Sequence, residues 1–170
     1  FPAIREAAAA KDVRAVFIQR SRGYGDRKSL TSAEIGELCA LVRSVNPGAA
    51  VIVDNCYGEF CETAEPTHHG ADLICGSLIK NPGGGLAPSG GYVAGRADLV
   101  EKAAFRLTVP GIGGECGPTL GLNRALFQGF FMAPHTVAQA LKTAVFCAAL
   151  LEDLGCDLSP RWDEDRCDII

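Results

Sequence analysis

Ala50-Val-Ile-Val-Asp54 is the stretch that decides the fold, because it is an apolar run of strand length that ends in a carboxylate. A second run of this kind, Asp72-Leu-Ile-Cys-Gly76, follows it along the chain. Both runs are too apolar to keep one face in water, and strands that are buried on both faces belong to a parallel sheet. The sequence therefore predicts two strands of a mostly parallel sheet.

The segments before these strands alternate between helix and strand. Residues 2–10 are rich in alanine and predict a helix, and residues 14–19 form a short apolar run that predicts the first strand. A capping box begins at Thr31, and apolar residues then recur on one face until Asn46-Pro-Gly48 ends the helix. This alternation predicts an α/β fold of three layers, with helices on both faces of a mostly parallel sheet.

The second half of the chain predicts one more strand and two more helices. Residues 91–95 follow a connection rich in glycine and proline that has no crossover helix, which favours an antiparallel neighbour for the preceding strand. A helix is expected near 97–106, and a second one of about twenty residues between Pro134 and Gly155. No domain boundary is evident within the chain.

Composition excludes several classes of protein. The 170 residues carry a net charge of −4 and no basic run, so we expect no nucleic-acid partner. No apolar stretch approaches the length of a membrane span and no signal peptide is evident, so the cytoplasm is the expected compartment and no membrane is expected as a partner. The chain starts at Phe1 rather than Met and stops as a new apolar segment begins, so we expect it to be part of a longer protein.

The cysteine and histidine pattern predicts neither a disulfide framework nor a metal site. A chain of this length does not need disulfide bonds between its eight cysteines to be stable, and most of these cysteines lie in apolar segments. We therefore interpret them as reduced thiols. No CxxC pair occurs, and the adjacent His68 and His69 point apart in most backbones. We interpret both histidines as surface residues of a loop.

Chemically useful side chains follow the second and third predicted strands. In open α/β sheets ligands bind outside the carboxyl ends of the strands, where Asp54, Tyr57, Ser77 and Lys80 supply an acid, a phenol, a hydroxyl and an amine. A Walker loop, a GxGxxG fingerprint and a GxSxG elbow are all absent. Pyridoxal phosphate chemistry fits instead, because a lysine forms an imine with the cofactor aldehyde and an acid keeps the pyridine nitrogen protonated.

Two segments, Val51–Tyr57 and Gly76–Asn81, resemble the strand-to-loop segment and the lysine segment of fold-type I pyridoxal phosphate enzymes. The resemblance implies that Asp54 pairs with the pyridinium nitrogen, that Tyr57 reaches the cofactor phenolic oxygen, that Ser77 holds the phosphate and that Lys80 forms the imine. More narrowly, three segments together are similar to the methionine gamma-lyase-like proteins that are also labelled aluminium resistance proteins, a family related to cystathionine beta- and gamma-lyases. The segments are Gln19–Tyr24, Gly76–Gly85 and Gly90–Gly95.

The chain also departs from that family. Cystathionine-lyase relatives carry a second hydroxyl residue directly before the lysine, where this chain has Ile79. The family's upstream glycine-rich phosphate loop, its stacking aromatic residue and its C-terminal domain have no match. The resemblance thus implies that residues 1–170 are part of the pyridoxal phosphate-binding major domain, without the upstream segment and the C-terminal minor domain, and hold about half a site.

The function implied by the resemblance is a pyridoxal phosphate-dependent carbon–sulfur lyase that acts on a sulfur-containing amino acid by beta- or gamma-elimination. Two alternatives stay open: another enzyme with the same cofactor, such as an aminotransferase, and a non-catalytic α/β binding domain. Each candidate residue also has an ordinary structural interpretation: Asp54 as a turn or cap, Lys80 as a surface lysine, Ser77 as a strand-end hydroxyl, Tyr57 as packing, and Arg20 and Arg22 as solvated loop charges outside the site.

Apolar residues in two segments predict assembly. Residues 107–114 and 126–132 are interpreted as loops with more hydrophobic side chains than one small core can bury, among them Phe127, Phe130 and Phe131. Such clusters mark interfaces, and the family resemblance implies active sites at a subunit boundary, so we expect a homodimer or homotetramer. The alternative is that these side chains pack on another domain of the same chain.

Overall fold

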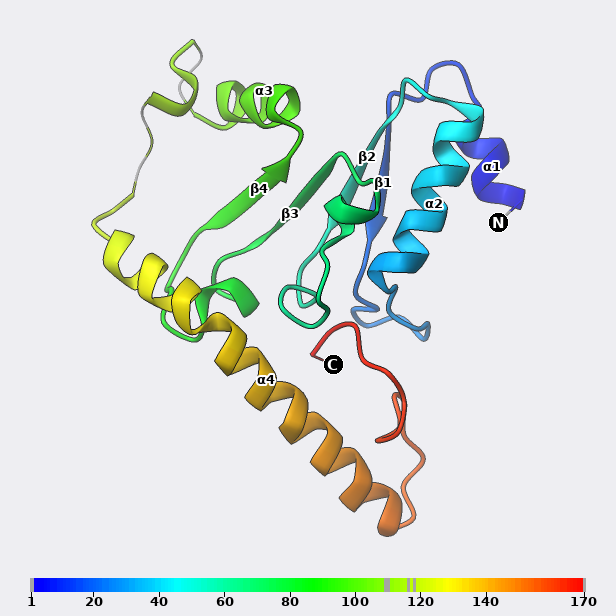
Figure 1. Ribbon diagram of the computed structural model, residues 1–170, viewed down its shortest axis with the longest axis vertical. Helices are drawn as coiled ribbons and strands as arrows, with labels where there is room; N and C mark the ends of the chain where they lie inside the picture. Colours follow the sequence, from blue (N-terminus) through cyan, green and yellow to red (C-terminus); the bar gives the residue numbers. More distant parts are fainter. Residues whose placement is uncertain (1, 109–110, 116, 118, 170) are drawn as a thin grey trace.

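The structure is a computed structural model that describes residues 2–108, 111–115, 117 and 119–169 (Figure 1). Val109 and Pro110, which fall in the apolar segment 107–114, lie outside the described residues, as does Cys116. Four strands form one sheet in the order β1 (Ala15–Gln19), β2 (Ala50–Asp54), β3 (Leu73–Ser77) and β4 (Gly91–Gly95). The first three are parallel and β4 is antiparallel to β3, which confirms the predicted mostly parallel α/β sheet and the direction of its last strand.

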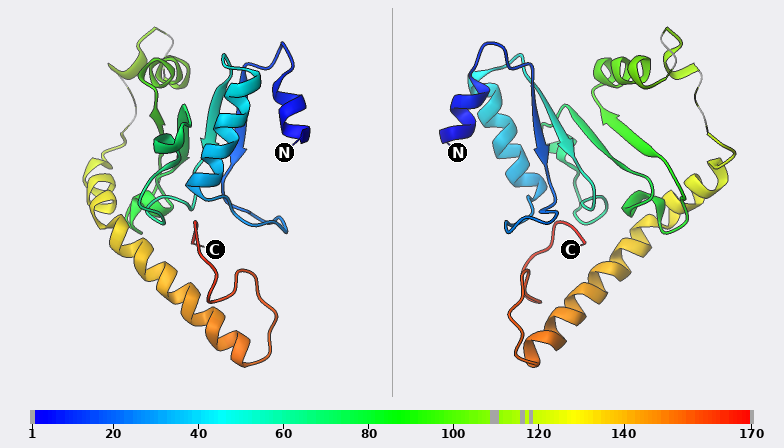
Figure 2. Two further views of the ribbon diagram at one scale, coloured as in Figure 1. Left: turned by 45° about the vertical axis from the view of Figure 1, so that its right-hand side comes forward. Right: turned by 180° about the vertical axis from the view of Figure 1, so that it is seen from behind.

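Two helices pack together on one side of the sheet (Figure 2). They are α1 (Pro2–Ala8) and α2 (Ser32–Val45), and α2 begins at the predicted capping box, in which Thr31 and Glu34 bond each other's backbone. Ile35 and Val42 of α2 are fully buried against Val51 and Val53 of β2. The opposite face is more open among the described residues, since Phe17 of β1 keeps 63% of its surface exposed.

The connection from β2 to β3 contains only a short 3-10 helix, η1 (Pro66–His69), whose two histidines are exposed as expected. A second short turn, η2 (Asn81–Gly83), follows β3, and α3 (Ala97–Leu107) lies beside β4 before the turn η3 (Gly113–Glu115). All the cysteines that the structure describes have free thiols.

The long helix α4 (Asn123–Asp153) corrects two predictions. It spans 31 residues and runs through Pro134, so the expected helix of about twenty residues is too short, and residues 126–132 are helical rather than a loop. Gly129 in this helix lies against the turn η2, because a Cβ atom there would come within 2.2 Å of the Gly83 carbonyl oxygen. A glycine that weakens a helix locally is therefore required by the close approach of two backbones.

The exposure of the aromatic side chains on α4 is confirmed. Phe127 and Phe131 keep 76% and 83% of their surface exposed, and Phe130 is partly covered by an edge-to-face contact with Phe60, with ring centroids 5.6 Å apart. Figure 1 shows α4 extending away from the sheet, and the tail that follows it returns toward the loop after β1. In the part of the chain that the structure describes, no helix has both the length and the apolar character needed to cross a membrane.

Candidate functional site

A small hollow lies at the carboxyl ends of β1 and β2, where the sequence predicts the site. We refer to it as the Asp54–Lys80 hollow. It is lined by Gln19, Ser21, Gly23, Asp54, Cys56, Tyr57 and Lys80. Its volume is about 80 Å³, whereas small-molecule sites usually enclose roughly 300–1,000 Å³. These residues therefore form one wall of a site rather than an enclosed pocket.

Asp54 reaches the hollow because of its place at the end of a strand. It is paired in register with Gln19 of β1 and Cys75 of β3, and its Oδ1 accepts a hydrogen bond of 3.1 Å from the Cys56 backbone N–H. Successive residues of a strand point to opposite faces, and Asn55, the next residue, is fully buried. The Asp54 side chain thus lines the hollow, while the Asn55 side chain lies in the protein interior.

Lys80 enters the same hollow from the loop after β3. Its Nζ lies 4.2 Å from the centroid of the Tyr57 ring, over the ring face. Burial by itself would lower the pKa of the Lys80 amine, but its interactions with Cys56 and Tyr57 together outweigh burial, and the pKa is raised. The structure therefore brings Asp54, Tyr57 and Lys80 together, and the amine is held by a ring and a thiol.

Ser77, the fourth predicted site residue, does not line the hollow. It is the last residue of β3 and half-buried, and its carbonyl oxygen accepts the Lys80 backbone N–H at 3.3 Å. It is thus adjacent to the site through the backbone, and its role as a phosphate ligand stays a prediction.

Cys56 and Ser21 line the hollow and were not identified from the sequence. Burial and then the Asp54 carboxylate raise the pKa of the Cys56 thiol, which favours its protonated form. The Ser21 hydroxyl is buried and finds no hydrogen-bond partner among the described residues. Their positions, two residues after the ends of β2 and β1, are the signal that would have found them.

Arg20 is not a solvated loop charge, which corrects the sequence interpretation. Its side chain is fully buried and donates to Asn55 Oδ1 at 2.7 Å, forms an ion pair with Glu62, and lies 3.6 Å from a Glu65 carboxylate oxygen. A buried guanidinium needs such partners because desolvation of an unpaired charge is costly. Arg22 is mostly covered and donates to the Ser159 carbonyl and hydroxyl oxygens, both at 3.1 Å.

A buried carboxyl group lies beneath the lysine segment. Burial raises the pKa of Glu59 to about 7, and its Oε1 accepts a hydrogen bond of 2.7 Å from the Tyr92 hydroxyl, while its Oε2 has no partner among the described residues. A Cβ atom on Gly76 would come within 2.4 Å of Glu59 Oε1. The glycine that opens the lysine segment is therefore required by this buried pair.

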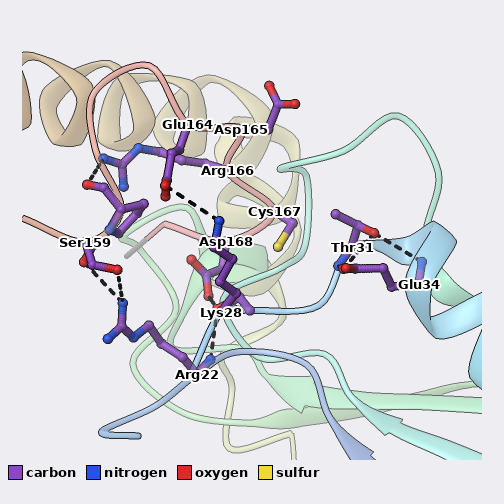
Figure 3. Close-up of a pocket in the computed structure, with 12 residues that line it drawn as sticks. Arg22, Lys28, Thr31, Glu34, Ser159, Glu164, Asp165, Arg166, Cys167 and Asp168 are labelled. Carbon is purple, nitrogen blue, oxygen red and sulfur yellow. Dashed lines mark hydrogen bonds and ion pairs between the residues drawn. The ribbon is translucent and has the colours of Figure 1, made fainter. Parts of the chain in front are cut away.

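Several larger hollows in the described chain lack this constellation, and two of them have a clearly defined lining. One, of about 280 Å³, lies where the tail packs on the loop before α2 (Figure 3). Its charged and polar groups are largely paired with each other, as in the contacts of Arg22 with Ser159 and of Lys28 with Glu164 at 3.6 Å. The other, of about 310 Å³, is almost wholly apolar and lies between Ile74, Tyr92 and Phe130.

Metal ligation has no support in the described residues, where no group of three or more histidine, cysteine, aspartate or glutamate side chains is arranged to hold an ion.

Comparison with known proteins places these residues in a family. The sequence model of the methionine gamma-lyase family matches residues 1–170. The chain belongs to the methionine gamma-lyase family. This membership confirms the resemblance inferred from the lysine segment and its neighbours.

Solved structures of similar proteins share the fold. A carbon–sulfur lyase involved in aluminium resistance from Clostridium novyi NT is 47% identical, with a TM-score of 0.93 over 99% of this chain and 40% of that chain. A methionine gamma-lyase from Micromonospora echinospora, CalE6, is 25% identical, with a TM-score of 0.65 over 89% of this chain and 39% of that chain. The first of these similarities covers nearly the whole of this chain.

A curated relative is more similar in sequence. The "Uncharacterized 33.9 kDa protein in glnA 5'region" of Lactobacillus delbrueckii subsp. bulgaricus is 54% identical over 155 residues, which are 91% of this chain and 51% of that protein. The chain spans about half the length of this relative.

Proposed function

We propose that the full-length protein is a pyridoxal phosphate-dependent carbon–sulfur lyase whose substrate is a sulfur-containing amino acid. The observation that carries the proposal is the placement of Asp54 and Lys80 in one hollow at the carboxyl ends of parallel strands. The names of the family and of its solved members support carbon–sulfur lyase chemistry.

The groups in the hollow fit this cofactor. A carboxylate is a suitable partner for a protonated pyridine nitrogen, and an amine is the group that bonds to an aldehyde. Asp54 and Lys80 provide these two groups, and the unpaired Ser21 hydroxyl provides a further hydrogen-bond donor and acceptor on the same wall. Asp54, Lys80 and Ser21 are the residues that would hold the cofactor, with Ser77 as the candidate for its phosphate.

When bound, the cofactor supplies an electron sink for the charge that develops at the substrate α-carbon. With the cofactor bound, the Asp54 carboxylate would keep a proton on the ring nitrogen, and the Lys80 Nζ would take the α-proton of the amino acid. The face of the Tyr57 ring contacts the amine, and this contact would restrict the movement of Nζ during proton transfer. The residues of this hollow serve elimination and amino-group transfer equally.

The test uses the full-length protein and its Lys80→Ala variant. We expect an absorbance band near the visible edge that disappears on borohydride reduction, with the cofactor mass on the peptide that carries Lys80. Attachment to Lys102 or Lys142 instead would contradict the assignment, and absence of the band would favour a non-catalytic domain. Release of a thiol and a 2-oxo acid, without amino-group exchange, separates the lyase from an aminotransferase.

A further inference from the structure

Asn81 directly follows Lys80 and is buried, with 5% of its surface exposed. Its side-chain amide donates two hydrogen bonds of 3.0 Å, one to the Tyr57 carbonyl oxygen and one to the Glu59 carbonyl oxygen. A primary amide has two N–H donors, so both are used on the loop that follows β2. Asn81 thus ties the lysine loop to the loop that carries Tyr57.

The backbone of that loop needs such support. Tyr57 has a φ angle of 71° and Phe60 one of 63°, both in the left-handed region that residues other than glycine rarely adopt. Conformations of this kind persist only where surrounding contacts hold them. The Asn81 amide binds the backbone at Tyr57 and at Glu59, next to Phe60, and the Cys61 thiol donates a longer bond of 3.4 Å to the Tyr57 carbonyl oxygen.

The other end of the Lys80 loop is fixed to α4. A Cβ atom on Gly84 would come within 2.3 Å of the Gly129 carbonyl oxygen, and the Thr136 hydroxyl donates to the Gly84 carbonyl oxygen at 3.3 Å. The loop therefore has two attachments, one to a rigid helix and one, through Asn81, to the wall of the Asp54–Lys80 hollow. The second attachment is the one that involves the Tyr57 backbone.

We propose that Asn81 is a positioning residue for Lys80: its amide holds Tyr57 in the left-handed conformation and so places the ring against which the Lys80 amine lies. This inference rests on the function proposed above. It assigns the placement of the amine over the Tyr57 ring to a buried amide that does not itself line the hollow.

The test compares Asn81→Ala and Asn81→Asp with Thr136→Val in the full-length protein. Asn81→Asp keeps the side-chain volume but removes the amide donors, and Thr136→Val removes a hydrogen bond to the same turn from the α4 side. Limited acetylation of the cofactor-free protein with acetic anhydride, followed by mass spectrometry, measures how accessible the Lys80 amine is. Exposed Lys102 and Lys142 serve as internal references.

In both Asn81 variants we expect acetylation of Lys80 to rise toward that of the two reference lysines, with no change in Thr136→Val. We also expect the rate of cofactor attachment to Lys80, trapped with borohydride, to fall by about a hundredfold, because small misplacements of reacting groups are costly. Unfolding is monitored by circular dichroism, and Asn81→Asp is decisive if Asn81→Ala does not fold.

Unchanged acetylation and unchanged attachment in a folded Asn81 variant would overturn the inference. An equal change in Thr136→Val would also overturn it, because the effect would then belong to the turn as a whole. If the wild-type protein takes up no cofactor at Lys80 while the acetylation still shifts, the proposed function fails and the positioning role of Asn81 stands.

Discussion

The Nζ of Lys80 lies over the face of the Tyr57 ring, 4.2 Å from its centroid. The two residues come from different loops, one after β3 and one after β2, and the contact fixes the amine at the edge of the sheet where Asp54 ends its strand. An ammonium group over an aromatic face is stabilised by about 0.5–1 kcal/mol when exposed, and by more when desolvated. The ring itself is therefore expected to matter, whatever contact its hydroxyl makes with a cofactor.

Replacing Tyr57 separates the ring from the hydroxyl. We expect Tyr57→Phe to keep the Lys80 amine in place, and Tyr57→Leu to increase its acetylation in the cofactor-free protein. Because the pKa of Lys80 is raised, the uncharged amine is the minor species at neutral pH, so cofactor attachment should accelerate as pH rises. A strong loss of cofactor in Tyr57→Phe would show that the phenol hydroxyl is the functional group, as the family resemblance implies.

Lyase activity is expected to depend on the negative charge of residue 54 more than on the size of its side chain. Asp54→Ala should lower lyase activity far more than Asp54→Glu, because a pyridine nitrogen without a carboxylate partner loses its proton and with it the electron sink. Steady-state kinetics of the full-length protein, together with the absorbance of the bound cofactor, measure this difference. A fully active Asp54→Ala enzyme would exclude the assigned role.

Ser21→Ala should weaken cofactor binding by about fivefold, the value of one hydrogen bond of roughly 1 kcal/mol. The hydroxyl has no partner among the described residues, so its removal should leave the cofactor-free protein equally stable or more stable. Equilibrium binding and thermal unfolding test the two effects, with exposed Ser44→Ala as the control. Loss of stability in the cofactor-free variant would show that the hydroxyl has a structural partner instead.

Glu59 makes stability depend on pH. Its pKa in the folded protein is about 7 against an ordinary value of 4.5, so the folded state binds the proton more tightly, and stability falls as pH rises from about 4.5 to 7 and stays lower above that range. Glu59→Gln should remove this loss and gain on the order of 3 kcal/mol relative to wild type between pH 4 and 8. Urea unfolding at pH 4 and pH 8 measures this gain, and the exposed Glu37→Gln variant, which keeps Glu59, should retain the wild-type fall in stability.

The exposed aromatic residues of α4 are expected to lie in a subunit interface. Light scattering at low concentration should show a homodimer or homotetramer of the full-length protein, and Phe127→Ser with Phe131→Ser should shift it toward monomer. Gln139→Ala, an exposed polar change on the same helix, is the matched control. A wild-type monomer that retains its cofactor would instead place these side chains against another part of the same chain.

Sequence patterns determined the strands and the order in which the chain uses them. The apolar runs ending at Asp54 and near Gly76, the capping box at Thr31 and the helix-free connection before Gly91 are local signals, so each predicted its element and even the antiparallel direction of β4. The placement of Asp54, Tyr57 and Lys80 near one another followed for the same reason, because the carboxyl ends of parallel strands meet at one edge.

Only the tertiary structure decided which residues support that edge. Gly129 and Pro134 predict a broken helix when read locally, but the approach of α4 to Gly83 requires a glycine within a continuous helix. In the sequence, Arg20 stands in a polar segment typical of a surface loop. In the structure it is buried and contacts Asn55, Glu62 and Glu65. Such roles depend on contacts with atoms from distant parts of the chain. A periodic sequence pattern carries no information about these contacts, because only the packing of the folded chain creates them.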